Sequence, residues 1–88
     1  MPYIAAEERP ALDELVDALA AEIGSEGYEG RLNYAITRLC LGVLPELRYK
    51  QLNALVGVLE CAKLELYRRL AAPYEDEQAL RNGDVYPH

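Results

Sequence analysis

Apolar residues near the start of the chain recur at the spacing of one helix face. They follow the i, i+3, i+4, i+7 rule, opposite a face of Asp, Glu and Ala, and comprise Leu12, Leu15, Val16, Leu19 and Ile23. Pro10 suits an early helical position, because the N–H that it lacks would be unpaired there. Gly24 supplies the residue type that commonly ends a helix. The pattern predicts a helix over about 9–23 with one apolar stripe.

A second apolar stripe follows a glycine-rich stretch at 24–30. It predicts a helix over about 31–44, ended by Pro45, whose core positions are Leu32, Ala35, Ile36, Leu39 and Val43. The stretch at 24–30 is interpreted as a connector rather than a phosphate-binding loop. It follows a helix instead of a strand and lacks the Gly-Lys-Ser/Thr ending.

The third predicted helix, about 49–72, is long and apolar on two sides. It ends before Pro73, since proline disfavours helix in the preceding residue. One face holds Leu52, Leu55, Val56, Leu59, Ala62, Leu66 and Leu70, and the opposite face holds Ala54, Gly57, Val58, Cys61 and Leu64. A helix of this kind is usually covered on both sides. Either the first two helices cover both faces, or one face meets a second copy of the chain across a two-fold axis.

These elements predict an all-α fold for a single domain, residues 1–88. We expect a three-helix bundle in which the long third helix is central. The tail, 73–88, is expected to be ordered but mostly irregular, with one helical turn over 78–81. A core built from 88 residues is thin, and oligomerisation commonly supplies additional burial at this size. We therefore favour a homodimer.

The candidate interface residues lie on two helix faces. Tyr34, Arg38 and Leu41 form a group on the outer side of the second helix, and such a composition is favoured at protein interfaces. The second face of the third helix adds small residues that allow close approach: Ala54, Gly57, Val58, Cys61 and Leu64. The leading hypothesis is a non-enzymatic interaction module, bound to itself or to another protein.

Charge and cysteine content narrow the alternatives. The formal net charge of −6 argues against binding to nucleic acid or to an anionic membrane surface. No apolar run approaches the ~18 residues of a membrane span, and the first residues lack a signal-peptide pattern. Cys40 and Cys61 are interpreted as free thiols in a reducing compartment. We expect a cytoplasmic protein without a cofactor.

The residues that usually carry catalysis are scarce. The single histidine is His88, and the single serine, Ser25, has no base near it in the sequence. Carboxylates are plentiful. The alternative hypothesis is a magnesium-dependent hydrolase of small phosphorylated substrates. Its metal ligands would be Asp13, Glu14 and Asp17, which share one helix face, together with Glu60. Such clusters occur in all-α nucleotide pyrophosphohydrolases, but here Lys63 stands where a second metal ligand is needed.

Lys63 is the most unusual local feature, because it lies inside the main apolar stripe of the third helix. Lysine is rarely buried without a partner, and Glu60 is three residues away. Either Lys63 reaches outward along its stem, which is the commoner case, or it pairs with a carboxylate such as Glu60. In the second case Asn33, Glu60 and Lys63 are candidates for a buried polar network. A third hypothesis is a small-molecule pocket around Asn33, Lys63 and Tyr67, which requires ~300 Å³ or more.

Several strings, together with the Met-Pro-Tyr-Ile start, resemble a family of short uncharacterised proteins from bacteria and their phages. They are Gly30-Arg-Leu-Asn-Tyr-Ala-Ile-Thr37, Val58-Leu-Glu-Cys-Ala-Lys-Leu-Glu-Leu-Tyr-Arg-Arg69, Ala72-Pro-Tyr-Glu-Asp76 and Asn82-Gly-Asp-Val-Tyr86. The resemblance spans nearly the whole chain. It implies that the tail belongs to the domain, and it assigns no activity, cofactor or site residue.

Overall fold

The computed structural model describes residues 2–87, and every regular element among them is helical. The all-α prediction is therefore confirmed, whereas the three-helix bundle stays a prediction. The chain divides into two compact units, Pro2–Leu55 and the part from Val56 onward. The elements in order are η1 (Ala6–Glu8), α1 (Arg9–Ile23), α2 (Tyr28–Val43), α3 (Tyr49–Leu66), η2 (Tyr67–Ala71) and α4 (Ala72–Asn82).

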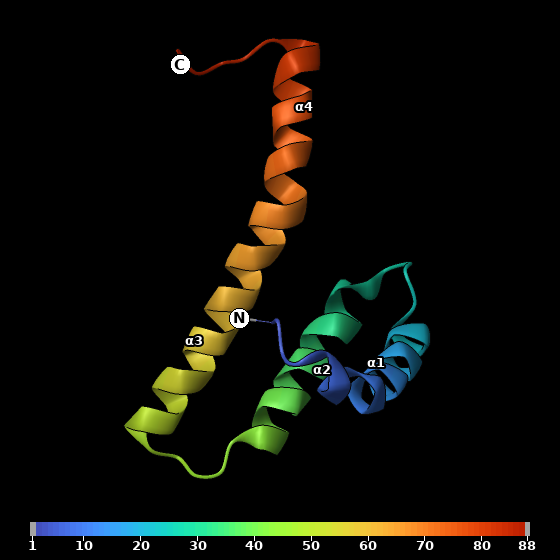
Figure 1. Ribbon diagram of the computed structural model, residues 1–88, viewed down its shortest axis with the longest axis vertical. Coiled ribbons are helices and arrows are strands. Elements are labelled where there is room, and N and C mark those ends of the chain that lie inside the picture. The colour runs from blue at the N-terminus through green and yellow to red at the C-terminus, as the bar shows by residue number, and fades with distance from the viewer. Residues whose placement is uncertain (1, 88) are drawn as a thin grey trace. The chain divides into compact units, whose positions relative to one another are not determined.

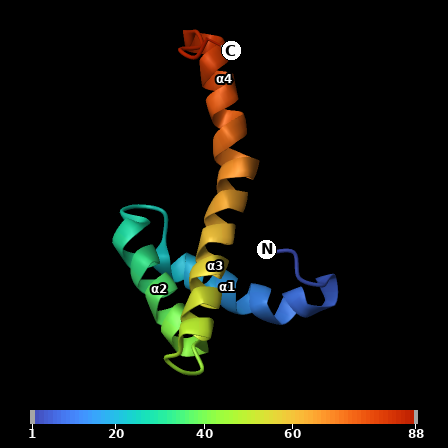
Figure 2. The same cartoon turned by 90° about the vertical axis from the view of Figure 1, so that its left-hand side faces the viewer.

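In the first unit, α1 and α2 form a helical hairpin in which the two helices cross (Figures 1 and 2). A short 3₁₀ turn, η1, precedes α1, and the Arg9 guanidinium donates two hydrogen bonds, of 3.0 and 2.8 Å, to the carbonyl of Ile4. At the far end of α1, Gly24 has a φ of 75° and its N–H bonds to the carbonyl of Ala20. This backbone angle favours glycine and ends the helix where the sequence pattern places its end.

The hairpin turn is shorter than the sequence pattern predicts, because α2 begins at Tyr28 rather than near residue 31. Gly27, at a φ of 59°, is the residue just before α2. Arg31 ties the turn together from the first part of α2. Its Nε donates to the carbonyl of Ile23 at 2.7 Å, and its Nη2 donates to the carbonyl of Glu26 at 2.6 Å. The first bond satisfies a carbonyl that the end of α1 leaves without a helical partner, and the second satisfies a carbonyl of the turn.

The helix that begins at Tyr49 does not end at Pro73. The chain passes from α3 through the π-helical segment η2 into α4 without a break, giving one helical stretch of 34 residues from Tyr49 (Figure 1). The sequence pattern predicted a mostly irregular tail from residue 73. This prediction is wrong, because irregular structure begins only at Gly83.

The π segment gives a physical reason for this continuation. In a regular α-helix, residue 73 would donate its N–H to the carbonyl of residue 69, and proline has no N–H to donate. In η2 the hydrogen bonds reach five residues back, as in the bond from the N–H of Ala72 to the carbonyl of Tyr67. The wider turn accommodates the proline ring, so the chain continues as a helix.

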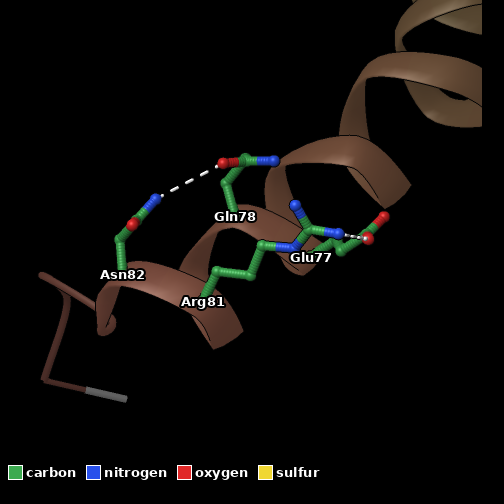
Figure 3. A network of polar contacts seen from close by, with 4 residues as sticks. All are labelled: Glu77, Gln78, Arg81 and Asn82. Atoms are coloured by element: carbon green, nitrogen blue, oxygen red, sulfur yellow. Dashed lines mark hydrogen bonds and ion pairs between the residues drawn. The ribbon is translucent and has the colours of Figure 1, made fainter.

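Two side-chain pairs with i,i+4 spacing support α4 (Figure 3). Arg81 Nη2 donates to Glu77 Oε1 at 3.0 Å, and Asn82 Nδ2 donates to Gln78 Oε1 at 3.3 Å. Pairs at this spacing stabilise a helix even when no other element packs on it. Gly83, with a φ of 88°, then ends the helix.

Most side chains of the apolar stripes that the sequence pattern assigns to the core remain exposed. None of the described side chains is buried, and Leu15 and Val43 each remain 69% exposed. Among the described residues, no helix combines the length and the apolar character that crossing a membrane requires.

Candidate functional site

The crossing of α1 over α2 leaves an open, mostly apolar groove of about 520 Å³ along α2. It is lined by Leu19, Tyr34, Ala35, Arg38, Leu39, Gly42 and Val43. Four of these residues come from the two stripes that the sequence pattern assigns to the core. Their side chains thus form a surface that can receive apolar groups from outside the hairpin.

Tyr34 and Arg38 supply the polar groups of this groove. Arg38 Nη1 donates a 2.9 Å hydrogen bond to the Tyr34 hydroxyl, and the guanidinium carbon lies 5.8 Å from the centre of the tyrosine ring. These contacts orient both side chains, although Tyr34 remains 62% exposed. The arrangement combines an apolar floor with one fixed cation, so it can bind an apolar segment that carries a carboxylate.

A second hollow, of about 350 Å³, continues the groove toward the hairpin turn. It shares Leu19, Tyr34 and Ala35 with the first and adds Glu22, Ile23, Gly30 and Arg31. Periodicity did not identify Arg31, because its bonds to the end of α1 depend on the fold of the turn. Leu41, which the sequence groups with Tyr34 and Arg38, is exposed but lines neither hollow.

Both apolar faces of the third predicted helix are open. On the face proposed for an interface, Val58 and Leu64 are more than half exposed, and Ala54, Gly57 and Cys61 are exposed as well. A Cβ added to Gly57 would meet no other atom within 4 Å. On the main stripe, Val56, Leu66 and Leu70 are each more than 60% exposed. Exposure alone therefore does not distinguish the two faces.

Of the residues considered for a buried polar network, Glu60 and Lys63 lie in the unit from Val56 onward and Asn33 lies in the unit Pro2–Leu55. Lys63 Nζ does pair with Glu60 Oε1 at 3.1 Å, but the Lys63 side chain is 69% exposed. Asn33 contributes only its main-chain carbonyl, which accepts a 2.8 Å hydrogen bond from the Thr37 hydroxyl. The buried network of Asn33, Glu60 and Lys63 stays a prediction. Asn33 lines neither hollow, and the pocket around Asn33, Lys63 and Tyr67 stays a prediction.

The carboxylates of the magnesium hypothesis do not form a recognisable metal site in the described part of the chain. Asp13, Glu14 and Asp17 are exposed on α1, and Glu60 is paired with Lys63. Among residues 2–87, no group of three or more Asp, Glu, Cys or His side chains is arranged to hold an ion. Cys40 and Cys61 are both free, and His88 lies outside the described residues.

Comparison with known families finds a match over most of the chain. The family model described as a domain of unknown function, DUF6899, matches residues 1–85. Comparison with curated proteins and with solved structures finds no match.

Proposed function

Because the chain belongs to the DUF6899 family, whose function is unknown, we propose on physical grounds that it is a non-enzymatic interaction module that acts as a homodimer. The supporting observation is the uncovered apolar stripe in the unit from Val56 onward. Within the described part of that unit, the helical stretch is the only regular element. A lone helix cannot cover its own stripe, and most helical stability in proteins comes from packing an apolar face.

A second copy is the partner that this proposal favours. Each copy brings the same uncovered stripe, so a two-fold arrangement covers both at once. In the proposed dimer, the helices of two chains together build the bundle that the apolar stripes predict. The Tyr34–Arg38 groove on the first unit remains a candidate surface for another protein.

We place this module in the cytoplasm of a bacterium or of a phage-infected cell. The two free cysteines support a reducing compartment, in which thiols persist without pairing. The bacterial and phage setting comes from the family that the sequence strings resemble.

Co-purification of two tagged copies tests the proposal. Two full-length chains with different affinity tags are expressed together, and one tag is used for capture. The homodimer predicts that the second tag is recovered with the first. Recovery of only the captured tag, with both chains soluble, would overturn it. Mixing the chains after separate purification serves as a control for slow exchange.

A further inference from the structure

The main stripe of the long helix repeats every seven residues. Leu52, Leu59 and Leu66 are seven apart, and Val56, Lys63 and Leu70 form a second series offset from the first by four. These two series correspond to the d and a positions of a heptad repeat, the pattern by which two helices pair side by side. We call these six residues the heptad seam. In chain order they are Leu52, Val56, Leu59, Lys63, Leu66 and Leu70.

The seam has defined limits and a centre. It starts with Leu52 in α3, and Leu66 is its last residue in the regular α-helix. Leu70 follows inside the π segment η2, where the wider turn begins to change the angular position of the residues. Its middle falls at Cys61. An antiparallel copy with its two-fold axis at this level places Val56 opposite Leu66 of the partner subunit and Leu70 opposite Leu52 of the partner subunit.

Charge decides the direction of pairing. In a parallel pair, residues with the same number meet in one layer, which places two Lys63 ammonium groups together. In the antiparallel pair, a and d positions share a layer, and the e position of each chain lies beside the e position of the other. Lys63 is an a residue and Glu60 is an e residue, so Lys63 then lies next to the partner's Glu60. The two chains thus bring two cations and two carboxylates together at the axis.

We propose that two copies of this chain pair antiparallel along the heptad seam, with Lys63 and Glu60 alternating across the two-fold axis. This proposal rests on the homodimer proposed above and adds the face, the direction and the register. The 3.1 Å pair between Lys63 and Glu60 shows that the two groups already lie on one side of the helix, where the partner's pair meets them. A single charged residue at an a position is known to fix register in such pairs.

Disulfide trapping tests which face of the long helix forms the dimer interface. Full-length chains with one cysteine each are compared: native Cys61 in a Cys40→Ala background, and Ala62→Cys in a Cys40→Ala, Cys61→Ala background. Ala62 is a g residue and faces Ala62 of the partner subunit across the axis, whereas Cys61 points away from the seam. We expect covalent dimers from Ala62→Cys and none from Cys61 under mild oxidation. The reverse result would place the interface on the Ala54–Gly57–Cys61 face and overturn the proposal.

The distance between two spin labels tests whether the two helices pair parallel or antiparallel. The labelled position leaves the residues of the heptad seam unchanged. A label at Glu75→Cys, in the same cysteine-free background, lies far from the axis along the helix. The antiparallel pair predicts a separation of about 40 Å between the two labels, whereas a parallel pair predicts less than about 20 Å. The shorter distance would overturn the proposal while leaving the homodimer intact, and a monomeric chain would overturn both.

Charge exchange tests the contact at the axis. Lys63→Glu places four carboxylates together, and we expect the dimer dissociation constant to rise by about tenfold or more. Adding Glu60→Lys to that variant should restore the constant to within about threefold of the parent. Arg81→Glu is the matched control, since it breaks the 3.0 Å pair with Glu77 outside the seam and should leave the constant unchanged. Equal effects of Lys63→Glu and Arg81→Glu would contradict the contact.

Discussion

At the scale of single residues, Arg31 connects three parts of the hairpin. Its side chain bonds the carbonyls of Ile23 and Glu26, which belong to the end of α1 and to the turn. The Arg31 side chain also lies beside Gly24, since a Cβ added to Gly24 would be 3.9 Å from Arg31 Nη2. One side chain therefore holds the end of α1, the turn and the start of α2 together.

Arg31→Met removes these bonds while keeping a long apolar stem. We expect the free energy of unfolding to fall by about 1 kcal/mol, because two charge-assisted hydrogen bonds to exposed carbonyls are lost. Urea unfolding at a fixed protein concentration measures the change. Arg48→Met is the control, because Arg48 makes an exposed ion pair of 3.2 Å with Glu46, and such pairs contribute little. If both variants lose the same stability, the role given to Arg31 is wrong.

At the scale of elements, sequence signals located the helix ends that depend on backbone chemistry alone. Gly24 ends α1, and Leu44, which precedes Pro45, has the extended backbone that a proline imposes on the residue before it. The start of α2 and the continuation past Pro73 were not predicted. Both depend on hydrogen bonds with unusual partners, from Arg31 and within the π segment, which the sequence pattern does not reveal.

Pro73→Ala tests the origin of the π segment. Alanine restores an N–H for the carbonyl of residue 69, so a regular α-helix becomes the more stable form across η2. We expect helix content to rise and the free energy of unfolding to increase by about 1–3 kcal/mol. Far-ultraviolet circular dichroism during urea unfolding measures both quantities.

Pro10→Ala is the matched control for that substitution. Pro10 is in the first turn of α1, where the missing N–H has no helical partner, so the change should be within about 0.5 kcal/mol. A loss of stability in Pro73→Ala would show that the proline favours the π turn instead of being tolerated by it.

At the scale of the whole molecule, the sequence predicted which side chains form apolar stripes but not what covers them. The stripes on α1, α2 and α3 lie on helices, as predicted, and most of their side chains remain exposed. Helical periodicity identifies the apolar face of a helix. It does not indicate whether that face packs against the same chain or against another chain. For the same reason, the groove residues Leu19 and Leu39 were assigned to a core.

Sedimentation equilibrium of the full chain across a dilution series tests the central proposal most directly. The homodimer predicts a mass of twice the chain's 9.9 kDa at high concentration. On dilution the mass should fall toward 9.9 kDa while helix content is lost. Mass and helix content are expected to fall together, because the heptad seam is covered only in the dimer. A mass of 9.9 kDa at every concentration, with helix content unchanged, would contradict the account.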